Sequence, residues 1–248
     1  MRTYGLIGYP LVHSFSRAFF TEKFVKERID ARYLNFEIPS IEAFPDIVAQ
    51  NPDLVGLNVT LPYKQQVIPF LGELSEEARA IGAVNVIRLT HAGNTVKLKG
   101  FNADVIGFVR SIQPLLKASH KKALVLGTGG ASKAVIYGLH SLFLETLSVS
   151  RHPQSGMIAY QDISSDVLKE YTVIVNCTPC GMFPHVEECP RFPYNLLGPE
   201  HVLYDLVYNP EETLFLTKGK QQGAVVKKGL EMLHLQALAS WDFWNGKE

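Results

Sequence analysis

A lysine placed for proton chemistry ends the segment Asn58–Lys64, which reads Asn-Val-Thr-Leu-Pro-Tyr-Lys. The pattern predicts a short strand ending at Val59, a capping residue at Thr60, and a helix with Pro62 in its first turn. Lys64 would lie in that turn, where the positive end of the helix dipole disfavours an ammonium. The amide of Asn58 and the hydroxyl of Thr60 suit a polyhydroxylated ligand. A capped surface helix with a solvated lysine is the alternative that this segment leaves open.

A glycine-rich turn follows a predicted buried strand at Lys122–Leu126. A helical pattern from Lys133 to Leu144 comes after the turn. This order is typical of a dinucleotide site, because glycines let the backbone approach a pyrophosphate at the helix N-terminus. A helix-capping serine in an ordinary turn is the alternative, since a serine stands where a third glycine is usual. The turn consists of Gly127, Thr128, Gly129, Gly130, Ala131 and Ser132.

The next predicted strand, Thr146–Ser150, ends at a cation. Arg151 and His152 follow it, and no Asp or Glu occurs before Asp162. A carboxylate at this place would bind the ribose 2′-hydroxyl of NAD, whereas a cation suits the 2′-phosphate of NADP. We therefore expect NADP (NADPH) as the cofactor, with a stray surface arginine as the alternative.

Composition indicates an ordinary globular protein with length for two modest domains or one large one. The chain has 248 residues, 46% of them hydrophobic, and its 24 basic and 24 acidic residues cancel. Zero net charge without runs of either sign argues against nucleic-acid or membrane partners. No apolar stretch has transmembrane length and no signal-peptide pattern is visible, so we expect a cytoplasmic protein.

The three cysteines come close to a zinc-site spacing, with His185 between the second and third. Cys177 follows a predicted buried strand, Tyr171–Asn176, and prolines interrupt the stretch between Cys177 and Cys189. A redox pair would open a helix, which Gly181 and the prolines disfavour. We therefore expect no metal site, and we interpret Cys177 and Cys180 as small residues near a cofactor loop.

Strand-like runs alternate with helical patterns along the whole chain, which predicts an α/β protein with parallel sheets. The boundary near Phe101–Asp104 gives a three-layer α/β domain over 1–103 and a Rossmann-type dinucleotide-binding domain over 104–229. Residues 230–248, which hold most of an amphipathic helix predicted over Gly229–Trp244, are expected to pack back on the first domain. Parallel sheets bind ligands beyond the C-terminal ends of their strands. Five notable residues fall at such ends: Asn58, Gly127, Arg151, Asn176 and Tyr208.

Further motifs occur in one order along the chain, and together they resemble the shikimate dehydrogenase family nearly end to end. The family's most specific motif is similar to Asn58–Lys64, and its paired serines resemble Ser14 and Ser16. The other matching segments are Gly82–Asn85, Gly100–Asp104, Gly127–Ser132, Asn176–Met182, Asp205–Pro210, Gly229–Gln236 and Trp241–Gly246.

The resemblance implies reversible, NADP-linked reduction of 3-dehydroshikimate to shikimate, a step in aromatic amino-acid (chorismate) biosynthesis. It implies Lys64 and Asp104 as the catalytic pair. The substrate would be held by Ser14, Ser16, Asn58, Thr60, Asn85, Asp104, Tyr208 and Gln236. The cofactor would be held by Gly127 to Ser132 with Ser150 and Arg151, and its nicotinamide end by Thr178, Leu206, Tyr208, Gly229, Met232 and Glu76.

Four positions depart from the family pattern: Arg17 replaces a usual proline, Ala103 a threonine, Ser150 an asparagine and Ser155 an arginine. They leave the reaction type unchanged but bear on how strictly NADP is required and whether quinate is accepted. An NAD-using quinate/shikimate dehydrogenase is one alternative, which a carboxylate at Arg151 would favour. A catalytically idle dinucleotide-binding protein is another, which loss of Lys64 or Asp104 would favour. The sequence leaves a monomer and a homodimer open.

Overall fold

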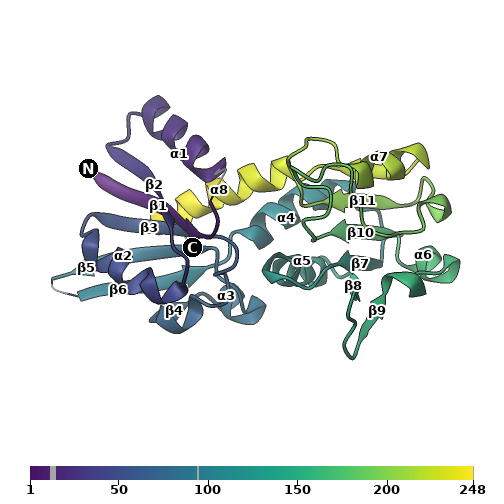
Figure 1. The fold of residues 1–248 in the computed structure, drawn as a ribbon, viewed down its shortest axis with the longest axis horizontal. Helices are drawn as coiled ribbons and strands as arrows, with labels where there is room; N and C mark the ends of the chain where they lie inside the picture. Colours follow the sequence, from purple (N-terminus) through teal and green to yellow (C-terminus); the bar gives the residue numbers. More distant parts are fainter. Residues whose placement is uncertain (12–14, 94, 248) are drawn as a thin grey trace. The chain divides into compact units, whose positions relative to one another are not determined.

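The computed structural model describes residues 1–11, 15–93 and 95–247, and it divides into two compact units (Figure 1). Unit 1 comprises Met1–Ala103 and Ala237–Glu248, and unit 2 comprises Asp104–Gln236. Each unit holds one six-stranded sheet. The two-domain α/β fold class predicted from the sequence is therefore confirmed.

The sheet of unit 1 has the strand order β2-β1-β3-β5-β6-β4. Strand β1 pairs in parallel with β2 and β3, whereas β5 is antiparallel to both β3 and β6. The strands are β1 (Arg2–Gly8), β2 (Ala31–Glu37), β3 (Leu54–Val59), β4 (Glu73–Leu74), β5 (Val86–Ala92) and β6 (Thr95–Phe101).

Helices cover both faces of this sheet, which gives three layers. Helix α1 (Phe15–Lys26) and the end of α8 (Leu230–Trp244) cover one face, where Trp244 contacts Tyr4 at a ring-centroid distance of 4.8 Å. Helix α2 (Phe44–Gln50) covers the other face and packs against Ile7 and Leu57 in the core. The remaining helix, α3 (Glu76–Ile81), begins at a Ser75 cap and ends at Gly82, whose φ of 68° is left-handed.

The sheet of unit 2 is parallel throughout its described pairs, with the order β12-β11-β10-β7-β8-β9. Because the chain runs outward from β7 through β8 and β9 and then returns to β10 on the other side, the order reverses between β7 and β10. Such a reversal leaves a ligand crevice at the C-terminal ends of the two strands. The strands are β7 (Lys122–Leu126), β8 (Glu145–Ser150), β9 (Met157–Ala159), β10 (Val173–Asn176), β11 (Val202–Asp205) and β12 (Val225–Lys227).

Two apolar clusters cover the two faces of this parallel sheet, and they explain why its strands are buried on both sides. Phe108 of α4 (Asp104–Ile112) and Leu139 of α5 (Gly130–Ser141) pack on one face with Val125. Leu168 of α6 (Ser165–Glu170) and Leu216 of α7 (Leu214–Gln221) pack on the other face. None of the described helices has the length and apolar character needed to cross a bilayer.

Several predicted boundaries differ from the observed ones. Helix α5 begins at Gly130, inside the glycine-rich turn. The sequence predicts a helix over Val105–Ala118, whereas α4 ends at Ile112 and a 3-10 turn follows at Gln113–Leu115. The return of the chain to unit 1 falls at Ala237 instead of residue 230. The first turns of α8 belong to unit 2 because Met232 lies in the core beside α4.

Candidate active site

The segment after β3 carries Lys64, and it is not the helix that the sequence predicts. Residues 61–67 form consecutive turns, a 3-10 helix follows at Ile68–Phe70, and the Leu61–Pro62 peptide bond is cis. The carbonyl oxygen of Lys64 accepts from the Val84 N–H at 2.7 Å, so a distant segment occupies the group that a helix would use internally. The prediction of a capped helix with Lys64 in its first turn is therefore wrong.

Two loops of unit 1 are joined by buried asparagines. Asn85 accepts a hydrogen bond from the Ala103 N–H at 2.7 Å through its Oδ1. Asn102 donates through Nδ2 to the Ala83 carbonyl oxygen at 3.0 Å. Both side chains are nearly inaccessible to solvent, at 3% and 2%. The two bonds hold the Gly82–Asn85 and Gly100–Ala103 segments together, directly before Asp104.

The other predicted substrate residues of unit 1 lie near the C-terminal ends of its strands or at the start of α1. Asn58 is the penultimate residue of β3 and is buried, and half-buried Thr60 follows that strand. Ser16 lies in the first turn of α1 and hydrogen-bonds the Tyr33 side chain. Ser14 lies outside the described residues. Exposed Glu76 begins α3, also in unit 1.

Asp104 and Gln236 are the first and last residues of unit 2. Asp104 begins α4, where a carboxylate is favoured by the helix dipole, and it is 7% exposed. Gln236 lies in α8, is 6% exposed and donates through Nε2 to the Leu233 carbonyl oxygen at 3.0 Å. Helices α4 and α8 approach closely here, because a Cβ added at Gly107 would lie 2.5 Å from the Met232 carbonyl oxygen.

The glycine-rich turn connects β7 to the N-terminus of the 12-residue helix α5. Gly127 has a φ of 100°, which favours glycine, and a Cβ there would lie 2.8 Å from Thr178 Cγ2. Gly129 is different: a Cβ there would meet no atom within 4 Å. Ser132 closes the turn by donating to the Gly129 carbonyl oxygen at 2.6 Å. The open space at Gly129, before a helix N-terminus, fits a dinucleotide pyrophosphate.

Strand β8 runs parallel to β7 and brings Ser150 and Arg151 to the same end of the sheet. Ser150 Oγ accepts from the His152 N–H at 3.1 Å, so it shapes the turn in which exposed Arg151 lies. Asp162, the first carboxylate after β8, accepts from the Ala159 N–H at 3.0 Å in the following 3-10 turn. The exposed cation directly after β8 is therefore Arg151, as the NADP prediction requires.

A buried polar network that sequence reasoning missed holds the loops after β10 and β11. Asp205 is fully buried, and its carboxylate accepts from Asn176 Nδ2 at 2.9 Å, from the Val207 N–H at 3.0 Å and from Thr213 Oγ1 at 2.5 Å. Burial raises the pKa of Asp205 to about 6. The sequence held one signal for this network: Asn176 and Asp205 are the last residues of the neighbouring buried strands β10 and β11.

The network also positions Thr178, because Asn176 Oδ1 accepts from both the backbone N–H and the hydroxyl of Thr178, at 3.0 and 2.6 Å. Leu206 and the start of α8 meet close by, since a Cβ on Gly229 would lie 2.5 Å from the Leu206 carbonyl oxygen. Met232 lies in the same core as Leu206, and burial raises the pKa of the half-buried Tyr208. The structure thus brings together Thr178 with Gly127, and Leu206 with Gly229 and Met232.

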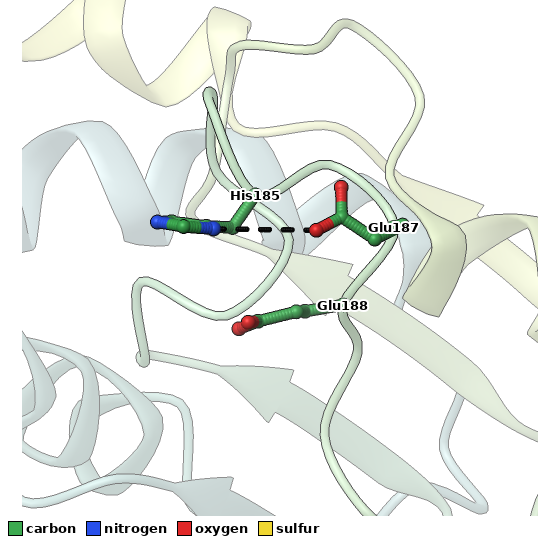
Figure 2. Close-up of side chains that lie close together, drawn as sticks. All are labelled: His185, Glu187 and Glu188. Carbon is green, nitrogen blue, oxygen red and sulfur yellow. Dashed lines mark ion pairs between the residues drawn. The ribbon is translucent and has the colours of Figure 1, made fainter.

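The three cysteines are free thiols, and burial raises the pKa of both Cys177 and Cys180. Side chains able to bind a metal meet elsewhere, at His185, Glu187 and Glu188 on the exposed loop after β10 (Figure 2). His185 Nδ1 lies 4.0 Å from Glu187 Oε1, and the two side chains are 69% and 72% exposed. Exposed groups of this kind are common without a metal.

Comparisons with known proteins identify relatives along the whole chain. Residues 6–87 match the family model described as the shikimate dehydrogenase substrate binding domain. The shikimate dehydrogenase (NADP(+)) of Desulforamulus reducens is 34% identical over 98% of this chain and 89% of its own length.

Solved structures agree with this result. The chain is similar to a chorismate mutase/shikimate 5-dehydrogenase fusion protein from Clostridium acetobutylicum, with a TM-score of 0.86, 36% identity, and coverage of 99% of this chain and 91% of that one. It is also similar to the Thermus thermophilus shikimate 5-dehydrogenase in complex with NADP(H) and shikimate. For that structure the TM-score is 0.86 and the identity 31%, with 99% and 94% of the two chains covered.

Proposed function

The chain belongs to the shikimate dehydrogenase family, and we propose that it catalyses the reversible reduction of 3-dehydroshikimate to shikimate with NADPH. The observation that carries this proposal is similarity over 98% of the chain to a shikimate dehydrogenase (NADP(+)), together with the retention of Lys64 and Asp104. The reaction belongs to aromatic amino-acid biosynthesis, and the protein is an oxidoreductase acting on a CH–OH group.

Lys64 and Asp104 form the catalytic pair in this proposal. NADPH, when bound, supplies a hydride to the ketone carbon, and negative charge then develops on the ketone oxygen. The Lys64 ammonium stabilises that charge and donates the proton that completes the hydroxyl group. The Asp104 carboxylate accepts a hydrogen bond from the same hydroxyl. In the reverse direction Lys64 takes the proton from the hydroxyl.

Each unit has its own role. Unit 1 binds the substrate, for which we assign Ser14, Ser16, Asn58, Thr60 and Asn85, and Tyr208 and Gln236 of unit 2 complete the set. Unit 2 binds NADP through Gly127 to Ser132, with Ser150 and Arg151 at the 2′-phosphate. At the nicotinamide end we assign Thr178, Leu206, Gly229 and Met232, and Glu76 from unit 1.

Arg151 supports NADP over NAD, because a phosphate needs a cation where a ribose hydroxyl needs a carboxylate. The exposed guanidinium of Arg151 follows β8 directly. Free cysteines and a pyridine-nucleotide reaction support a cytoplasmic location. We expect a monomer or a homodimer with small-molecule ligands alone.

The direct test is absorbance of the reduced nicotinamide, with purified protein supplied with shikimate or quinate and with NADP or NAD. The proposal is supported if NADP is rapidly reduced with shikimate and the other three pairs show no comparable turnover. Comparable turnover with quinate or NAD would assign the chain to the NAD-using quinate/shikimate dehydrogenases. A folded protein that turns over none of the four pairs would be a dinucleotide-binding protein without this activity.

A further inference from the structure

The carboxamide of Asn58 is held from three directions inside unit 1. Its Nδ2 donates to Ser240 Oγ at 2.9 Å and to the Asn85 carbonyl oxygen at 3.3 Å. Its Oδ1 accepts from the Tyr33 hydroxyl at 2.8 Å. A backbone carbonyl oxygen can only accept, so the nitrogen of the carboxamide must face Asn85. The orientation of the carboxamide is therefore set by its neighbours.

These contacts decide which hydrogen bond Asn58 can still make. A carboxamide has two N–H donors and two oxygen lone pairs. Both N–H groups are directed at Ser240 and the Asn85 carbonyl oxygen, and one lone pair takes the Tyr33 proton. What remains is a single oxygen lone pair, which accepts a hydrogen bond and cannot donate one.

Tyr33 is fixed as firmly as Asn58. It is 4% exposed, and its ring stacks on Phe20 with a centroid distance of 5.0 Å and an angle of 11° between the planes. Trp244 packs against the same ring at 6.4 Å. Burial raises the pKa of Tyr33, so its hydroxyl keeps its proton and remains a donor to Asn58. Ser240 is fully buried on α8 and faces Asn58 from the other side.

We propose that Tyr33 and Ser240 are positioning residues that present Asn58 to the substrate as a pure hydrogen-bond acceptor, so that the substrate group at Asn58 must be a hydroxyl. This inference rests on the proposed function. Neither the carboxylate of the substrate nor the ketone of 3-dehydroshikimate can donate a proton, and either group placed at the Asn58 oxygen would meet a lone pair. Asn58 therefore selects the ring orientation that turns a hydroxyl toward β3.

The first test is the variant Tyr33→Phe, which removes the hydroxyl and keeps the stacked ring. Asn58 then loses the partner of its oxygen and is held less firmly. Ser16 loses its hydrogen bond to Tyr33 in the same variant, so Ser240→Ala, which keeps the Tyr33 hydroxyl, separates the effect on Asn58 from the effect on Ser16. We expect the KM for shikimate to rise by about 10-fold, the scale of one lost hydrogen bond, with kcat within about 3-fold and the KM for NADP unchanged. Ser240→Ala should likewise raise the KM for shikimate while kcat stays within about 3-fold of the wild-type value.

Tyr204→Phe is the matched control. Tyr204 is fully buried in unit 2, and its hydroxyl lies 2.6 Å from Ser111 Oγ, so this variant also deletes one buried tyrosine hydrogen bond. A general loss of stability would appear in both variants, whereas the rise in the KM for shikimate should appear only in Tyr33→Phe. If Tyr33→Phe does not fold, Ser240→Ala carries the test.

The second test asks directly whether the substrate donates. Analogues of shikimate in which one hydroxyl at a time is replaced by fluorine keep the size of the group but cannot donate a proton. The analogue that lacks the hydroxyl facing Asn58 should bind the wild-type protein about 10-fold more weakly than shikimate. In Tyr33→Phe this penalty should shrink below about 3-fold, because Asn58 is no longer held as a pure acceptor.

An unchanged KM for shikimate in both Tyr33→Phe and Ser240→Ala, or an equal analogue penalty in wild type and Tyr33→Phe, would overturn the inference. Those results require an active wild-type protein. A folded wild-type protein that fails to oxidise shikimate would instead overturn the proposed function, so the two failures are distinguishable.

Discussion

The Val84 N–H donates a hydrogen bond of 2.7 Å to the carbonyl oxygen of Lys64. In an α-helix this oxygen would accept from the N–H of Ile68, which instead bonds Gln65 at 3.2 Å. The backbone of Lys64 is thus held by the segment that leads to Asn85. Asn85 Oδ1 also accepts a hydrogen bond from the N–H of Ala103, the residue before Asp104. The Val84–Asn85 segment therefore holds the backbone of both Lys64 and Ala103.

Lys64→Ala should lower kcat for shikimate oxidation by between about 100-fold and 10,000-fold, because the variant loses the group that moves the proton. The fold should persist, since the variant keeps the backbone oxygen of Lys64 and its hydrogen bond from the Val84 N–H. Steady-state kinetics and thermal unfolding measure both effects. Lys97→Ala, at an exposed position of β6, is the control and should keep its activity. A near-native kcat in Lys64→Ala would remove Lys64 from the catalytic pair.

Arg151→Ala should raise the KM for NADP by at least about 10-fold and leave the KM for NAD unchanged, because only NADP carries the 2′-phosphate. Initial rates with each cofactor at saturating shikimate give both values. Lys169→Ala removes another exposed cation of unit 2, which pairs with Asp166 at 2.9 Å, and should change neither value. Equal effects of Arg151→Ala on the two cofactors would contradict the assignment of Arg151.

Gly129→Ala and Gly229→Ala should have different effects, because an added Cβ enters open space at Gly129 but meets the protein backbone at Gly229. A Cβ on Gly129 meets no protein atom, so this variant should lose less than about 1 kcal/mol of stability while the KM for NADP rises by about 10-fold. A Cβ on Gly229 would lie 2.5 Å from a backbone oxygen, so this variant should lose about 1–3 kcal/mol. Urea unfolding and cofactor titration of each variant measure the two quantities. A normal KM for NADP in Gly129→Ala would place the pyrophosphate elsewhere.

Asp205 should make the stability of the protein depend on pH in the acidic range. Its pKa is raised to about 6 in the folded protein, above the ordinary aspartate value of 3.8. Between these two values the folded state binds the additional proton, so this contribution is fully present below pH 3.8 and is lost as the pH rises through about 6. The shift corresponds to at most about 3 kcal/mol.

Asp205→Asn removes the titrating group and keeps much of the hydrogen bonding. The difference in free energy of unfolding between wild type and Asp205→Asn should therefore change between pH 4 and pH 7, about the range that the shift spans. Urea unfolding at several pH values measures this difference. A constant difference across the range would show that Asp205 titrates at its ordinary value in the folded protein.

Local patterns were sufficient for much of the fold. Strand β7 begins and ends where the sequence predicts, and β3 ends at the predicted Val59. Runs of apolar residues bounded by turn residues specify a buried strand without reference to the rest of the chain. The glycine-rich turn and the cation after β8 are local features too. For this reason the α/β class, the dinucleotide unit and the preference for NADP could be inferred from the sequence.

Contacts between distant segments decided the rest. Pro62 and Thr60 favour a helix locally, but the hydrogen bond from Val84 to Lys64 replaces it with turns. Tyr33 and Ser240 show no motif, and they meet Asn58 across 25 and 182 positions of the chain. The sequence by itself indicated which residues are candidates for the chemistry, and it determined the family to which the chain belongs. Only the tertiary structure decided how Asn58 and Lys64 are held, because buried hydrogen-bond partners come from whichever segments the fold brings together.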